Sequence, residues 1–271
     1  MSRQTIKQSK RIVVKIGTNS LLDDNNQLNY RRIDRLAYVL STLVQYKKEV
    51  ILVTSGAIGV GCAQLNIAER PVAIPKQQAI ASVGQVALMT VYDRFFGYYN
   101  QPVGQVLLTK DIIDFPESYI NYQNSMNALL NNQIIPIINE NDAVAVEEMD
   151  HHTRFGDNDT LSGMVARTTA ADLLILLTDV DGFYSGNPQS DASAKRFKVL
   201  YEVTDELMEM AGDKGSTFST GGMQTKLRAA KQLLIDQIST AIMSSHDPSD
   251  IFSLLDGYDI GTVFIPETKE D

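Results

Sequence analysis

Cysteine, histidine and tryptophan are scarce in this sequence, which has one cysteine, three histidines and no tryptophan in 271 residues. A single cysteine excludes an internal disulfide and is typical of a reducing compartment, so we expect a cytoplasmic location. Cys62 stands among small residues in "GVGCAQL", which favours a packing role over a nucleophilic one. His151, His152 and His246 form no cluster with cysteine, so we expect no transition-metal site.

Long apolar runs and an excess of basic residues are also missing. No run of eighteen apolar residues occurs, which predicts that the chain does not cross a membrane. The first residues, "MSRQTIKQSKRIVVKIG", lack the apolar stretch and small-residue cleavage site of a signal peptide. The formal net charge is −9 and no basic stripe is present, so nucleic acid is not an expected partner.

Apolar runs alternate with helical patterns along most of the chain. The predicted strands lie in 11–17, 49–61, 103–109, 134–142, 172–182, 240–245 and 261–265. The predicted helices lie in 30–48, 75–99, 117–132, 158–171, 204–212, 221–237 and 249–257. Continuous apolar strands separated by helices predict an α/β fold with a mainly parallel open sheet between helices, in three αβα layers. The irregular segment 143–157 is expected to form a hairpin or flap.

The residues that follow the strands are of a few recurring kinds. "KIGTN", "TSGAIGVG", "NEND" and "TDVDG" supply glycine, hydroxyl, amide, lysine and aspartate, and no Ser-His-Asp or Cys-His set. Ligands of open α/β sheets bind beyond the carboxyl ends of the strands, and these residue types suit phosphates and carboxylates. Lys15 lies inside an apolar strand, where a buried ammonium needs an anionic partner.

The stretch "STGGMQTK" at 219–226 has the residue types of a phosphate cradle. It is not a P-loop, because Thr225 and not glycine precedes Lys226. From these residues alone, a phosphate site and a flexible turn before a helix are equally favoured.

Six motifs in one order change that balance. "VVKIGTNSL", "TSGAIGVG", "IPIINENDAVA", "FGDNDTLS", "LLTDVDGFYSGNP" and "STGGMQTKL" together resemble the amino acid kinase family, from Arg11 to Phe264. Within that family, "SGAIGVG", "NENDAVA" with "GDND", and "TGGMQTK" are similar to the members that act on glutamate. The resemblance implies an enzyme that uses ATP and Mg²⁺ to phosphorylate the side-chain carboxylate of L-glutamate. Its product would be L-glutamate 5-phosphate, in the first step of proline biosynthesis.

The resemblance also assigns roles to residues of this chain. It implies catalytic roles for Lys15, Lys226 and Asp159, and binding of glutamate by Ser55, Asp142 and Asn158. The residues implied at the ATP site are Lys15, Gly17, Thr178, Asp179, Thr220, Gly221, Gly222, Met223, Gln224, Thr225 and Lys226.

The same resemblance sets expectations about domains and regulation. The chain ends where many relatives add a PUA domain, so we expect one domain over 1–271 without it. Its substrate half is expected at about 1–170 and its nucleotide half at 171–271. "MDHHTR" lengthens the flap relative to several family members, which bears on any feedback inhibition by proline.

Assembly is expected from the aromatic-rich segment 91–100, whose five rings cannot all face one sheet. We predict a homo-oligomer, a dimer or tetramer, with part of this segment at the contact and with Phe96 and Tyr99 sensitive to charged substitution.

Two alternatives stay open. One is a kinase of the same fold with another small acceptor, such as N-acetylglutamate, aspartate, carbamate or uridylate. The other is a nucleotide-binding sensor without catalysis. A nicotinamide-linked dehydrogenase is disfavoured, because the first strand lacks the G-x-G-x-x-G fingerprint.

Overall fold

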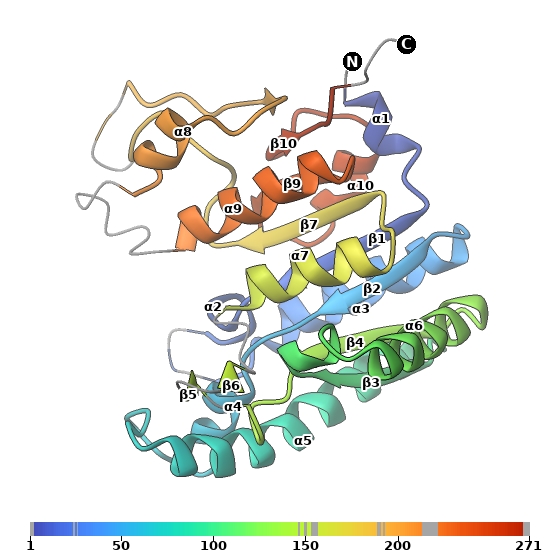
Figure 1. Cartoon of the computed structure of the whole chain (residues 1–271), viewed down its shortest axis with the longest axis vertical. Helices are drawn as coiled ribbons and strands as arrows, with labels where there is room; N and C mark the ends of the chain where they lie inside the picture. The colour runs from blue at the N-terminus through green and yellow to red at the C-terminus, as the bar shows by residue number, and fades with distance from the viewer. Residues whose placement is uncertain are drawn as a thin grey trace. The chain divides into compact units, whose positions relative to one another are not determined.

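The computed structural model describes residues 3–23, 25, 27–145, 147–148, 151–152, 157–188, 191, 193–212 and 222–267. The strands are β1 (Arg11–Ile16), β2 (Glu49–Val53), β3 (Val103–Leu108), β4 (Ile135–Glu140), β5 (Glu147–Glu148), β6 (His151–His152), β7 (Leu173–Thr178), β8 (Val199–Leu200), β9 (Ser239–Ser244) and β10 (Thr262–Phe264) (Figure 1). The α-helices are α1 (Gln4–Lys7), α2 (Thr18–Leu21), α3 (Tyr30–Gln45), α4 (Ala57–Gln64), α5 (Ile74–Tyr98), α6 (Pro116–Asn131), α7 (Asn158–Thr168), α8 (Asp205–Met210), α9 (Gly222–Ile235) and α10 (Asp250–Leu255). A 3₁₀ turn, η1, covers Lys110–Ile112.

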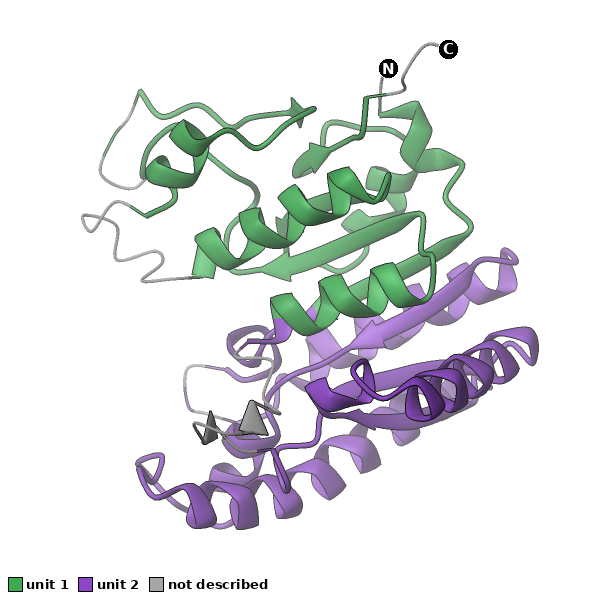
Figure 2. Cartoon of the chain, in the orientation of Figure 1, with its two compact units in different colours: residues 1–15, 159–271 green, residues 16–158 purple. Residues whose placement is uncertain are grey.

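The chain divides into two compact units (Figure 2). Unit 1 combines Met1–Lys15 with Asp159–Asp271, and unit 2 is Ile16–Asn158. The sequence predicts a boundary between the two halves at about residue 170, whereas the structure divides the chain between 158 and 159 and also between 15 and 16. Residues 11–15 of β1 belong to unit 1, where the backbone N–H groups of Lys10 and Arg11 donate to Asp172 Oδ2 at 2.6 and 2.8 Å.

Unit 2 has the strand order β3-β4-β2, with both pairs parallel. In Figure 1, α6 lies in front of these strands and α3 behind them. The helix α3 buries an apolar stripe that includes Ile33, Leu36 and Leu40, and the side chain of Asn29 caps its first turn.

Glycines allow α4 and α5 to pack closely in unit 2. A Cβ at Gly84 of α5 would overlap the carbonyl oxygen of Ala57, and one at Gly61 of α4 would overlap that of Ile80. Part of the "TSGAIGVG" motif therefore serves helix packing. The segment predicted at 75–99 is one continuous helix, α5.

Unit 1 has the strand order β1-β7-β9-β10-β8. Strand β9 is parallel to β7 and antiparallel to β10, and β10 is parallel to β8. In Figure 1, α9 lies in front of these strands and α10 behind them. The prediction of a mainly parallel sheet between helices is confirmed.

The aromatic segment 91–100 differs in part from its prediction. Tyr92 and Phe96 are fully buried and Tyr98 is 67% exposed. Phe96 is a core residue because it faces the interior of unit 2 on α5, so its expected place at a contact between subunits is wrong.

The segment 143–157 contains the expected hairpin. Glu147 pairs with His152 and Glu148 with His151 in an antiparallel ladder. Among the described residues, every helix is too short or too polar to span a bilayer.

Candidate active site

Three charged side chains meet in the interior of unit 1. Lys15 Nζ lies 2.6 Å from Asp159 Oδ1, and Lys226 Nζ lies 3.0 Å from Asp159 Oδ2. All three residues are at most 8% exposed. The buried ammonium of Lys15 thus has the anionic partner that its place in an apolar strand requires. Two ammonium groups share one carboxylate, which leaves one positive charge in excess.

Each of these residues is placed by a different element. Lys15 lies in β1, Asp159 in the first turn of α7, and Lys226 one turn inside α9. The ammonium of Lys226 also donates to the carbonyl oxygen of Gly222 at 3.0 Å. Thr225 Oγ1 donates to Asp159 Oδ2 at 2.8 Å. The two lysines, separated widely in sequence, are therefore held by the same aspartate.

The electrostatics of Asp159 follow from this arrangement. Burial alone would raise the pKa of this carboxyl, but the ammonium groups of Lys15 and Lys226 outweigh burial and lower its pKa. Both lysines also donate hydrogen bonds that favour the ionised form. Asp159 therefore stays a carboxylate at neutral pH.

A second polar cluster lies in unit 2 around Asn158. Its Nδ2 donates to the backbone oxygen of Thr54 at 2.7 Å and to Ser55 Oγ at 2.5 Å. The side-chain oxygen Oδ1 of Asn139 lies 3.3 Å from the same nitrogen, and the side-chain nitrogen Nδ2 of Asn139 donates to Gln85 Oε1 at 2.8 Å. The structure thus brings Ser55 and Asn158 into contact, which is expected of two residues that belong to one predicted site.

Asn139 and Gln85 were not among the residues that the sequence singled out. Both are buried, and their side chains connect β4 to α5. Asn139 stands at the start of "NEND", so a polar residue in an otherwise apolar strand was the available signal. Gln85 lies mid-helix and gave none.

Asp142 lines a cavity of roughly 270 Å³ in unit 2, together with Gln85, Gln105 and Glu140. Ser55 and Asn158 are not among its lining residues. Asp142, the third residue predicted to bind glutamate, therefore lines a cavity whose wall includes Gln85. Gln85 also belongs to the hydrogen-bond network around Asn158.

The residues predicted at the ATP site fall in both units. Thr178 Oγ1 donates to Asp179 Oδ1 at 2.8 Å at the end of β7, and Gly222, Met223 and Gln224 open α9. Gly17 is the N-cap of α2 in unit 2. Thr220 and Gly221 lie outside the described residues.

The sequence pattern of the amino acid kinase family matches residues 10–244, most of the chain. The chain belongs to the amino acid kinase family. A glutamate 5-kinase of Listeria monocytogenes is 51% identical over 99% of this chain and 97% of its own length. A glutamate 5-kinase of Enterococcus faecalis is 50% identical over 97% of both chains.

Solved structures show the same fold at lower sequence similarity. A UMP kinase from Bacillus anthracis matches this amino acid kinase with a TM-score of 0.64, at 17% identity, over 96% of this chain and 97% of its own. A carbamate kinase from Giardia lamblia, bound to AMP-PNP, matches with a TM-score of 0.66 at 17% identity, over 96% of this chain and all of its own.

In the part of this amino acid kinase that the structure describes, side chains offer little to a metal ion. Within the described residues, no group of three histidine, cysteine, aspartate or glutamate side chains is placed to hold one. Both carboxylate oxygens of Asp159 lie within 3.0 Å of an ammonium nitrogen, so this residue does not fit a metal ligand.

Proposed function

We propose that this chain transfers the γ-phosphoryl group of ATP to the side-chain carboxylate of L-glutamate. The product is L-glutamate 5-phosphate, and the reaction is the first step of proline biosynthesis. One observation carries the proposal: two buried ammonium groups share a single buried carboxylate. The excess positive charge suits an anionic ligand such as a phosphoryl group. Relatives about half identical in sequence over nearly the whole chain, and named glutamate 5-kinase, support the choice of acceptor.

The reaction needs no general base. A glutamate side chain has an ordinary pKa of about 4.3 and is already ionised at neutral pH. A carboxylate oxygen forms a bond to the γ-phosphorus as the bond from that phosphorus to the ADP oxygen breaks. The difficulty is the repulsion between two anions, and Lys15 and Lys226 reduce it by flanking the transferring group. Asp159 acts by holding both ammonium groups in place.

Glutamate binding is proposed for the cluster in unit 2. The amide of Asn158 and the hydroxyl of Ser55 suit the carboxylate and ammonium groups of an amino acid. Asp142 supplies a carboxylate for the substrate ammonium from the wall of its cavity.

Nucleotide binding is proposed for Thr178, Asp179 and the start of α9. Mg²⁺, when bound with ATP, neutralises phosphate charge. It would be held by phosphate oxygens and water, because Asp159 is committed to the two lysines.

An assay with several acceptors tests this proposal. The purified chain is supplied with Mg²⁺–ATP and, separately, L-glutamate, N-acetylglutamate, aspartate, carbamate or uridylate, and ADP release is measured. We expect turnover with L-glutamate, and faster turnover with another acceptor would reassign the substrate. ATP binding without turnover on any acceptor would favour the sensor alternative.

We further propose that the enzyme is a cytoplasmic homo-oligomer that proline inhibits. An aromatic cluster supports the assembly: Tyr30 and Tyr98 are exposed, and their ring centroids lie 6.1 and 6.0 Å, respectively, from that of the half-buried Phe95. Light scattering should give a mass above that of one 30.0 kDa chain. Tyr98→Glu should lower that mass, and a wild-type monomer would contradict the assembly.

Adding proline to the glutamate assay tests inhibition. Unchanged turnover in the presence of proline would exclude it.

A further inference from the structure

The hydroxyl group of Thr262 connects three segments of unit 1. Thr262 is fully buried at the start of β10. Its Oγ1 accepts a hydrogen bond from the backbone N–H of Phe183 at 2.8 Å. It lies 2.6 Å from the backbone oxygen of Phe197, to which it donates its one hydrogen. The side chain thus joins β10 to the segment after β7 and to the segment before β8.

The segment after β7 rests against this junction. It starts at Asp179, whose carboxylate accepts a hydrogen bond from Thr178, and reaches Phe183 four residues later. Phe197 N donates to Phe183 O at 2.9 Å, and the two rings stack with centroids 5.2 Å apart. Backbone, ring and hydroxyl contacts therefore all fix Phe183, and through it the short segment back to Asp179.

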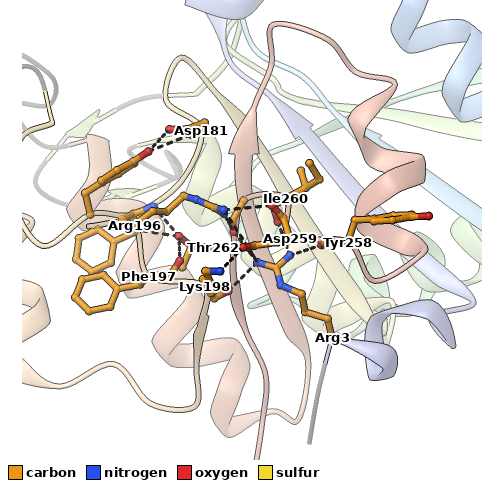
Figure 3. Close-up of polar contacts among 12 residues, drawn as sticks. Arg3, Asp181, Arg196, Phe197, Lys198, Tyr258, Asp259, Ile260 and Thr262 are labelled. Carbon is orange, nitrogen blue, oxygen red and sulfur yellow. Dashed lines mark hydrogen bonds and ion pairs between the residues drawn. The ribbon is translucent and has the colours of Figure 1, made fainter. Parts of the chain in front are cut away.

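The fit of this segment leaves little space. A Cβ at Gly182 would lie 2.9 Å from Thr262 Oγ1 and 2.7 Å from Arg196 Cδ. Arg196 is itself held, because its guanidinium donates to the backbone oxygen of Gly261 and, at 3.0 Å, to Asp259 Oδ1 (Figure 3). The surface that supports the segment is therefore fixed on both sides of Thr262.

Arg3 holds the same surface from the other end of the chain. Its guanidinium donates to Lys198 O at 2.8 Å and to Gly261 O at 2.7 Å, and it pairs with Asp259 at 3.3 Å (Figure 3). Two arginines thus share the Gly261 oxygen immediately before Thr262, which limits movement of β10 at this point.

We infer that Thr262 is a positioning residue for nucleotide binding, acting through Phe183 on the segment that carries Asp179. This inference rests on the proposed function, in which Asp179 contacts ATP. Replacing the hydroxyl by a methyl group leaves the buried N–H of Phe183 without its acceptor, so the segment shifts to find another. Nucleotide affinity should fall, while the glutamate cluster in unit 2 does not depend on this hydroxyl.

The test compares Thr262→Val, which keeps the shape, with Thr262→Ser, which keeps the hydroxyl. Calorimetry on the whole chain measures the Kd of the Mg²⁺ complex of β,γ-imido-ATP, and assays measure the KM of glutamate at saturating ATP. We expect Thr262→Val to weaken the nucleotide Kd by about 10-fold and Thr262→Ser to stay within about 2-fold of wild type. The KM of glutamate should be unchanged in both variants.

Two results would overturn the inference: a wild-type Kd in Thr262→Val, or equal weakening in both variants. Should Thr262→Val not fold, Gly182→Ala decides in its place, since its methyl group crowds both Thr262 Oγ1 and Arg196 Cδ and so pushes the segment off the surface that supports it. Weakened binding there supports the inference and unchanged binding rejects it. A wild-type chain that binds the analogue but phosphorylates no glutamate would reject the proposed acceptor and leave this test intact.

Discussion

Lys15 and Asp159 form an ion pair of 2.6 Å in which both side chains are at least nine-tenths buried. Lys15 lies in the first strand and Asp159 at the start of a helix more than half the chain away. The carboxylate holds a second ammonium, that of Lys226, through its other oxygen. This arrangement keeps two positive charges close together without their repulsion driving them apart, as the proposed phosphoryl site requires.

Replacing Asp159 tests whether the carboxylate organises the lysines. Asp159→Asn keeps the shape but leaves two buried ammonium groups without a counter-charge. Breaking a buried ion pair from one side typically costs roughly 3–5 kcal/mol of unfolding free energy. We expect a loss in that range in urea unfolding, together with a large fall in kcat.

The matched control is Asp205→Asn, which removes the carboxylate of an exposed pair with Lys231 at 3.1 Å. Exposed pairs contribute at most about 1 kcal/mol, so this variant should unfold and turn over like wild type. Equal effects of the two substitutions would reject a special role for Asp159.

Lys226 should contribute to turnover more than to folding. Lys226→Met removes the cation and keeps most of the side-chain volume, and Asp159 retains Lys15 as its partner. Loss of a charge-stabilising group at the transition state typically lowers kcat by about 100- to 1,000-fold. Steady-state kinetics with circular dichroism separates the two effects.

Lys231→Met in the same helix, α9, is the control for that substitution. In the described structure, the Lys231 ammonium forms only an exposed ion pair, with Asp205. Its kcat should match wild type. Near-normal turnover in Lys226→Met would remove Lys226 from the mechanism.

Stability should depend on pH through Asp159. Its folded-state pKa is lowered, so the unfolded chain binds a proton at this site more readily than the folded chain does. The stabilisation from the ionised carboxylate is fully present above its ordinary pKa of about 3.9 and is lost as pH falls towards the lower folded value.

Urea unfolding between about pH 3 and 6 measures this dependence, and Asp159→Asn should flatten the curve in its acidic part. Identical slopes for wild type and Asp159→Asn would show that the two lysines do not lower the pKa of this group.

Asn158 should affect the acceptor and not the nucleotide. Its amide holds Ser55 Oγ at 2.5 Å and Thr54 O at 2.7 Å, and Asn158→Ala removes these contacts. A lost hydrogen bond to a charged substrate group should raise the KM of glutamate by roughly 10- to 100-fold. The KM of ATP should change little.

Asn132→Ala is the control in the same unit. Among the described residues, the exposed side-chain amide of Asn132 donates only to the backbone oxygen of Ala128, one helical turn away. A rise in the KM of ATP in place of that of glutamate would show that the proposed substrate and nucleotide sites are exchanged.

The sequence predicted the main strands and long helices because their patterns are local. The run "LLILLT" reads as a buried strand wherever it occurs, and all six residues of β7 are buried. The short elements α1, α2 and β8 gave no such signal, because two to four residues carry no recognisable period.

Contacts between distant residues were harder to predict. Motifs indicated Lys15, Asp159 and Lys226 individually, but only the fold shows that one carboxylate holds both ammonium groups. Thr262 and Gln85 make buried hydrogen bonds to partners far along the chain, and neither stands in a motif. The wrong placement of Phe96 has the same origin, since an aromatic cluster does not reveal which rings face the core.

Transfer of an oxygen isotope tests directly whether the glutamate side-chain carboxylate attacks ATP. L-glutamate labelled with ¹⁸O in that carboxylate is incubated with the enzyme, Mg²⁺–ATP and hydroxylamine. Hydroxylamine attacks the acyl carbon of the product, so the released phosphate keeps the bridging oxygen. Direct attack by this carboxylate gives inorganic phosphate that carries one ¹⁸O atom, together with the γ-hydroxamate of glutamate. Unlabelled phosphate, or ADP release without hydroxamate, would contradict it.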